Sequence, residues 1–133
     1  MSDSPNLPEI GDEERLARFV VFSGWVRSSD KTIKPDAFIP AKNLELSVTR
    51  HIDLTEEELW KLGEDVTSKR PDRPKLYGRA DMSVRAVRSR ALTVTPTAQP
   101  RNHANICGWP ADKPAQKAIA QDLAAAASYV ARP

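Results

Sequence analysis

The chain has 133 residues, a formal net charge of +2 and one cysteine. A chain of this length is typical of one domain that folds without a disulfide or a structural metal. A single cysteine forms no internal disulfide, the acidic N-terminus does not look like a signal peptide, and no apolar run is long enough to cross a membrane. We therefore expect a cytoplasmic protein without membrane contact, and the abundance of Arg and Ala favours a bacterial source.

The N-terminal third is expected to be an arm followed by strands. Residues 1–13 are acidic and rich in Pro, which predicts a mobile arm before a single domain over 14–133. Residues 14–27 fit both a helical stripe and a strand, and their β-branched and aromatic run favours a strand. An extended segment is expected over 31–40. In residues 44–50 Leu and Val alternate with polar residues, which predicts a half-buried strand.

The strongest local signal is a capping box. Thr55 and Glu58 stand at the spacing at which each side chain accepts a hydrogen bond from the other residue's backbone N–H. Leu54 and Leu59 occupy the staple positions around the box. The sequence therefore predicts a helix over 56–67, ended by Pro71 and Pro74, and then a basic loop from Lys69 to Lys75.

Further elements follow in the C-terminal half. Asp81 is expected to cap a short helix over 82–88, residues 92–95 to form a strand, and Asp112 to cap the last helix. The expected apolar side of that helix consists of Ala115, Ile119, Leu123, Ala126 and Val130. The order of elements predicts an α+β domain with a mostly antiparallel sheet of about four strands, two main helices and one short helix.

Charge is divided unevenly along the chain. Residues 1–66 hold 8 Lys and Arg against 14 Asp and Glu, whereas residues 67–133 hold 12 against 4. Such a split indicates either an anionic partner, such as nucleic acid bound by the Lys69–Arg101 segment, or two halves that pair and neutralise each other. We favour the second interpretation because the net excess is only +2.

Residues 101–110 (RNHANICGWP) are the densest run of special residues. His103 in a non-helical segment suits a general base or a phosphate ligand, or else a half-buried side chain bonded within a tight turn. Cys107 is expected to be a small buried apolar residue rather than a nucleophile. Trp109 before Pro110 is expected to pack under the last helix at a strand-to-helix corner.

The candidate ligand-binding residues combine this run with nearby arginines, because guanidinium groups bind phosphates and carboxylates. His103 is the one candidate for catalysis. A pairing of His51 with His103 as in two-His phosphoesterases is disfavoured, because Asp53 and Asn105 stand where those enzymes have hydroxyls. No metal or cofactor motif is present, so we expect neither. The candidate set is Arg79, Asp81, Arg101, Asn102, His103 and Asn105.

Two blocks, LYGRAD at 76–81 and NHANICGWPADKPAQ at 102–116, resemble a set of small bacterial proteins usually described as uncharacterised. Together with LELSVTR and EELW, the resemblance covers nearly the whole chain after residue 14. It implies that residues 77–81 and 103–110 are signature positions and that an apolar residue is usual at position 107. It supplies no activity.

These observations predict a non-catalytic binding module that docks on a protein partner within a larger bacterial system. The alternative is an enzyme or binder that acts on a phosphate-bearing ligand through His103 with Arg79, Arg101 or Arg50. A third hypothesis is modest nucleic-acid binding by the basic half.

Overall fold

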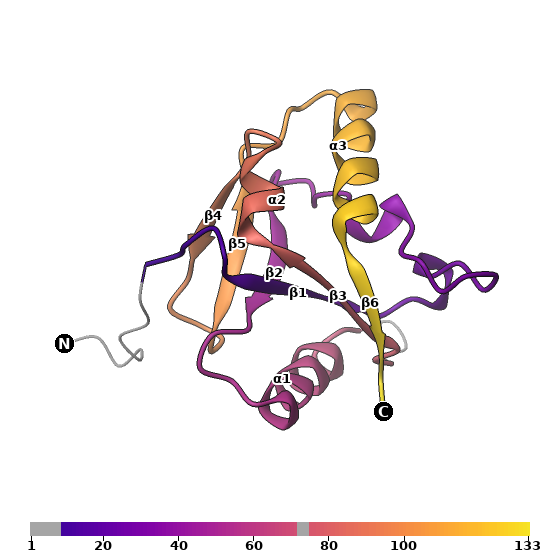
Figure 1. The fold of residues 1–133 in the computed structure, drawn as a ribbon, viewed down its shortest axis with the longest axis vertical. Helices are drawn as coiled ribbons and strands as arrows, with labels where there is room; N and C mark the ends of the chain where they lie inside the picture. The colour runs from indigo at the N-terminus through magenta and orange to yellow at the C-terminus, as the bar shows by residue number, and fades with distance from the viewer. Residues whose placement is uncertain (1–8, 72–74) are drawn as a thin grey trace.

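The computed structural model describes residues 9–71 and 75–133. They form an α+β fold around one six-stranded antiparallel sheet, with the strand order β4-β5-β2-β1-β3-β6 (Figure 1). The α+β class and the antiparallel sheet are confirmed, but the expected number of strands, about four, was too low. The strands are β1 Arg15–Val20, β2 Leu46–Arg50, β3 Gly78–Ser83, β4 Thr93–Pro96, β5 His103–Cys107 and β6 Ser128–Ala131.

Three α-helices and two short 3₁₀ helices accompany the sheet in the described residues. They are α1 Glu56–Ser68, α2 Val84–Arg88, α3 Lys113–Ala126, η1 Ser23–Trp25 and η2 Pro35–Phe38. The second part of the strand expected over 14–27 contains η1 instead, and η2 occupies residues 35–38 of the extended segment expected over 31–40. Pro35 at the first position of η2 explains the latter, because its fixed φ suits the first turn of a helix.

The capping box of α1 is confirmed. Glu58 N donates to Thr55 Oγ1 at 3.1 Å, and Thr55 N donates to Glu58 Oε1 at 2.9 Å. Hydrogen bonds to the Glu58 carboxyl from the backbone N–H and the side chain of Thr55 hold its pKa below its ordinary value. The helix ends at Ser68, before Pro71, while Pro74 lies outside the described residues.

The start of α2 differs from the prediction. Asp81 lies inside β3, and Ser83 caps the helix instead by accepting a hydrogen bond from Ala86 N at 3.2 Å. Ser is one of the residue types favoured at this position, because its hydroxyl accepts a hydrogen bond from a backbone N–H of the first turn. Asp112 does cap α3, as expected, by accepting from Ala115 N at 2.9 Å.

Two strands were missed in the C-terminal third. In β5, Ala104 and Ile106 are buried while His103, Asn105 and Cys107 are half-buried, which is the alternation of a strand. Strand β6 was missed because the alanines before Ser128 favour a helix, so the predicted helix reached Val130. The helix α3 ends at Ala126. The buried residues of α3 are Gln116, Ala120, Leu123 and Ala124.

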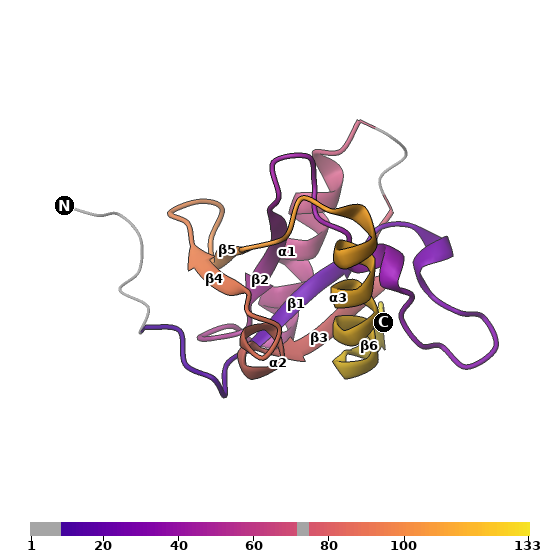
Figure 2. The same ribbon diagram turned by 90° about the horizontal axis from the view of Figure 1, so that it is seen from above.

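The sheet is covered on both faces (Figures 1 and 2). On one face, β-strand residues such as Leu16 and Ile106 pack in the main core with Val87 of α2, Leu123 of α3 and Phe38 of η2. On the other face, α1 covers a smaller core formed by Ala17, Phe19, Leu59, Trp60 and Leu76, against which Leu54 packs. Among the described residues, none of the helices is long and apolar enough to cross a membrane.

The N-terminal segment is only partly described. Residues 1–8 of the expected mobile arm lie outside the described residues. Further along, Asp12 and Glu13 form ion pairs with α2, where Arg88 Nη1 lies 2.7 Å from Asp12 Oδ1 and Arg85 Nη2 lies 2.6 Å from Glu13 Oε1.

Trp109 lies in the main core, as expected, and its exposed fraction is 5%. Its Nε1 donates to Ile106 O at 3.0 Å, so the indole has a polar partner as well as apolar contacts. The Trp109→Ala variant is expected to lose about 3–5 kcal/mol of unfolding free energy, because a buried aromatic side chain leaves a cavity. Chemical denaturation beside the parent measures the loss. Phe22→Ala, at an exposed position, is the control, and equal losses in the two variants would contradict the assignment.

Candidate functional site

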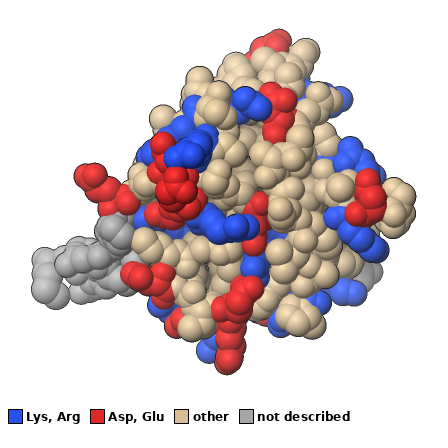
Figure 3. Space-filling model, in the orientation of Figure 1, with Lys and Arg blue, Asp and Glu red and all other residues tan. Residues whose placement is uncertain are grey.

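Five arginines of the basic segment are paired with carboxylates. The exposed charges of both signs are interspersed on the face shown in Figure 3. Four of these five arginines have a partner in the acidic N-terminal half, so the interpretation of mutual neutralisation is supported for these residues. The pairs are Arg79 with Glu56 and Asp81, Arg85 with Asp12 and Glu13, Arg88 with Asp12, Arg90 with Asp122, and Arg101 with Glu58.

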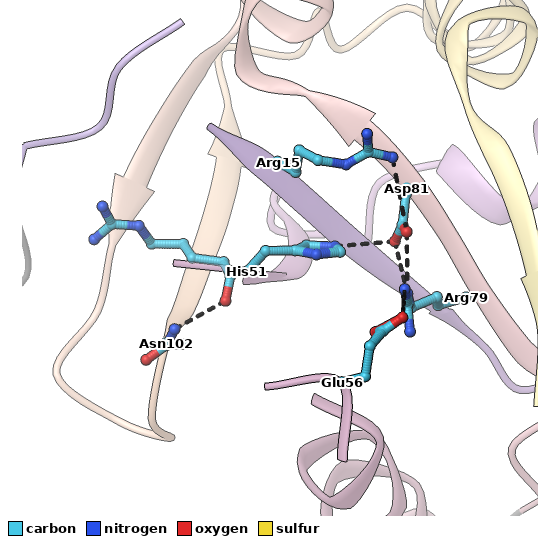
Figure 4. A network of polar contacts seen from close by, with 7 residues as sticks. Arg15, His51, Glu56, Arg79, Asp81 and Asn102 are labelled. Carbon is cyan, nitrogen blue, oxygen red and sulfur yellow. Dashed lines mark hydrogen bonds and ion pairs between the residues drawn. The ribbon is translucent and has the colours of Figure 1, made fainter. Parts of the chain in front are cut away.

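Asp81 is the centre of a buried ion cluster (Figure 4). Arg79 Nε and His51 Nε2 each lie 3.0 Å from Asp81 Oδ1, and Arg15 Nη2 lies 3.9 Å from Oδ2. Arg79 also donates through Nη2 to Glu56 Oε1 at 2.9 Å, which ties β3 to the first turn of α1. The cluster therefore joins two strands, the loop before α1 and the helix itself.

The centre of the cluster is shielded from water, whereas Arg15 and Glu56 at its edge are exposed. The side chains of Asp81 and Arg79 are 3% and 5% exposed, whereas that of His51 is 20% exposed. Burial lowers the pKa of Arg79, but the hydrogen bonds and charges of Glu56 and Asp81 outweigh it and raise the pKa. The guanidinium also lies 4.7 Å from the centre of the Trp60 ring. Within the described residues, its Nη1 is buried without a hydrogen-bond partner.

These contacts give the cluster a structural role in seating α1 on the sheet. The Asp81→Asn variant is expected to lose about 3–5 kcal/mol of unfolding free energy, because it removes the buried carboxylate of Arg79 and leaves only the exposed carboxylate of Glu56. Arg85→Gln is the control and should change stability by about 0–1 kcal/mol, since its ion pair is exposed. Urea denaturation measures both. A loss in Asp81→Asn no larger than in Arg85→Gln would show that the buried charges do not depend on one another.

The other predicted residues are spread over the fold. Asn102 is buried at a φ of 61°, and its Nδ2 donates to the carbonyls of Arg50 and Ile52, so it holds the end of β2. Arg101 forms an exposed pair with Glu58. Asn105 lies half-buried on β5, facing away from the main core.

Cys107 is half-buried, less than expected for a small core residue. Its Sγ lies 4.0 Å from Glu45 Oε2 and 3.8 Å from Asn105 O. In the described residues, no group of three or more His, Cys, Asp or Glu side chains is arranged to hold a metal ion.

His103 lies on β5 and faces the side of the sheet that carries α1. Its Nδ1 is 2.7 Å from Thr97 Oγ1, and Thr97 N donates to the backbone carbonyl of His103. Burial lowers the pKa of His103 below its ordinary value, while the charge of Glu45 opposes this change. The imidazole is therefore neutral at pH 7 and offers one donor and one acceptor.

A cleft opens beside His103 because β1 and β2 separate. Their ladder contains only the pairs Leu16–Arg50 and Ala17–Thr49. Beyond it, Arg18 fills the gap, where Nε donates to Ala37 O at 2.9 Å and Nη1 donates to Ser47 O at 3.0 Å. Backbone carbonyls that would otherwise lack partners are thus satisfied by a side chain.

We call this cavity of about 60 Å³ the Arg18 cleft. Its polar and aromatic lining comprises Arg18, Phe19, Trp25, Ser47, Thr49, Arg70 and His103. Burial and, to a smaller extent, repulsion by Arg70 together lower the pKa of Arg18 to about 10. The Arg18 guanidinium therefore remains cationic at pH 7, and Arg70 adds a second guanidinium to the cleft. Within the described residues, the hydrogen bonds of Arg18 go to carbonyl oxygens and no carboxylate lies within ion-pair distance of it.

Of the residues that line the Arg18 cleft, His103 is the one that was predicted from the sequence as a candidate. Arg79 and Asp81 share the buried cluster instead, and Arg101, Asn102 and Asn105 do not line this cleft. The one available signal for the missed residues was Arg18 itself, a charged residue inside the apolar run LARFVV. Arg70, just past α1, looked like part of a solvated basic loop.

Comparisons with known proteins found no matching protein-family model, no matching curated protein and no matching solved structure. The resemblance to small bacterial proteins therefore stays a prediction. The protein is therefore classified by its geometry. It is an antiparallel α+β protein with helices on both faces of the sheet and a cationic cleft where two strands separate.

The lowered pKa of His103 implies a pH dependence of stability. Because the folded state binds the proton less tightly than the unfolded state, stability is present above the ordinary pKa of 6.5 and is lost as pH falls from there towards the folded-state pKa. The His103→Gln variant is expected to lose less stability than the parent over this window. Thermal melts at a series of pH values test the difference, and parallel curves for the two proteins would refute it.

Proposed function

We propose that the chain is a binding module that holds a phosphate-bearing or similar anionic ligand in the Arg18 cleft. The observation that carries the proposal is the presence of two guanidiniums, Arg18 and Arg70, in one small cavity with His103. An anion bound between the two guanidiniums is attracted by both of them. Guanidinium groups also match the oxygens of a phosphate geometrically.

The donors of the cleft suit such a ligand. Arg18 uses Nε and Nη1 for backbone carbonyls, which leaves Nη2 without a protein acceptor among the described residues. Ser47 and Thr49 add hydroxyl groups, and His103 adds a ring nitrogen beyond the one near Thr97. The volume of about 60 Å³ is roughly twice that of one water molecule in the liquid, so the cleft takes a small anionic group and not a whole larger ligand.

The other expectations remain predictions. Docking on a protein partner is favoured by Phe22, the one exposed large apolar side chain of the described residues, at 38% exposure. Binding of nucleic acid along the Lys69–Arg101 segment is less favoured, because five of its arginines are paired with carboxylates. A cytoplasmic location likewise remains a prediction.

Titration with inorganic phosphate at constant low ionic strength tests the proposal, with binding followed by NMR shifts of the Thr49 and His103 amides. The shifts are expected to saturate. Arg70→Gln is expected to weaken binding about 10-fold or more, because a hydrogen bond to a charged group contributes about 1.5–3 kcal/mol. Arg85→Gln removes the same charge outside the cleft and should have little effect.

Two results would overturn the proposal. One is the absence of saturable shifts in the parent protein. The other is equal weakening in Arg70→Gln and Arg85→Gln, which would show that phosphate responds to net charge and not to a site.

A further inference from the structure

A wider aromatic groove adjoins the Arg18 cleft. The two cavities share Val21 and Trp25, and the groove has a volume of about 540 Å³. Its lining adds Phe22, Asp36 and Tyr77. A volume of this size is within the range that holds a small organic molecule, so the two cavities together offer a place for an anionic group and for a larger apolar group attached to it.

Two arginines and two aromatic rings connect these cavities. The Phe22 and Trp25 rings meet edge to face, with centroids 5.0 Å apart and planes at 63°. The Arg70 guanidinium lies 5.1 Å from the Phe22 centroid, and that of Arg18 lies 5.3 Å from the Trp25 centroid. Each cation of the cleft is therefore in contact with an aromatic ring that faces the groove.

The Phe22 side chain is exposed, although contact between an apolar ring and water gives no gain in free energy. Gly24, which also lines the groove, has no atom within 4 Å of the position that a side chain would occupy, so the groove is open beside the rings. Aromatic faces next to arginines form the usual platform for a nucleobase, because every base has a flat π-face and carries its phosphate nearby. Asp36 supplies a carboxylate that accepts hydrogen bonds from sugar hydroxyls or a base amino group.

We propose that the cleft and the groove together bind a nucleoside monophosphate, with its phosphate between Arg18 and Arg70 and its base on Phe22 and Trp25. The inference rests on the proposed function, since it assigns the phosphate to the Arg18 cleft. It adds the class of ligand, which the cleft alone leaves open.

Calorimetric titrations of the intact chain with AMP, ribose 5-phosphate, adenosine and phosphotyrosine test the inference. AMP is expected to bind at least about 5-fold tighter than ribose 5-phosphate, the lower end of the effect of stacking one base. AMP should also bind tighter than adenosine, which lacks the phosphate, and tighter than phosphotyrosine, which lacks the sugar and the base.

Variants at Phe22 separate stacking from simple apolar contact. Phe22→Leu keeps an apolar side chain without a π-face and is expected to bring the affinity ratio of AMP to ribose 5-phosphate towards one. Phe22→Tyr keeps the ring and should retain the ratio. Because Phe22 is exposed, thermal melts should show that both variants fold.

The outcomes distinguish this inference from the proposed function. If inorganic phosphate and ribose 5-phosphate bind but AMP binds no tighter, the nucleotide assignment fails and the anion site stands. If phosphotyrosine binds tighter than AMP, the occupant is a phosphorylated side chain and the nucleotide is rejected. If none of the phosphates binds, both proposals fail, and the exposed Phe22 then favours a protein partner.

Discussion

The arrangement of the sheet face that carries α1 depends on the buried carboxylate of Asp81. An ionised group that is 3% exposed needs cations and hydrogen-bond donors around it, and here they come from Arg79, Arg15 and His51. The same Arg79 holds Glu56 in the first turn of α1. The position of α1 thus depends on a polar contact at its start, and apolar packing through Leu59 and Trp60 follows along its length.

This constraint reaches the Arg18 cleft because α1 runs from one to the other. Val66, near the end of the helix, and Arg70, just beyond it, line the cleft, while Glu56 at its beginning contacts the ion cluster. The cleft consequently has one wall carried by the sheet and one carried by the helix. Its width is set by how the cluster and the smaller core seat that helix.

Local chemistry made part of this structure predictable. The capping box at Thr55 and the Asp112 cap are read from neighbouring residues, and both are confirmed. The predicted start of α2 was wrong because Asp and Ser are both residue types that cap helices. The pairing of β3 with β1 places Asp81 in a strand and leaves Ser83 as the cap. The Arg18 cleft was out of reach for a similar reason: it exists because β1 and β2 share only two residue pairs, which no local pattern encodes.

The strand order also has a consequence for how the chain folds. Strand β1 is central, yet its neighbour β3 lies some sixty residues further along, and β2 pairs with β5 across a similar separation. Loops of that size must close before these contacts form, which slows folding relative to a protein built from adjacent hairpins. Because β6 pairs with β3, the sheet is not complete until the residues up to Ala131 have been synthesised. A chain that is still incomplete therefore exposes unpaired strand edges. Such edges make a polypeptide prone to aggregation unless chaperones bind it.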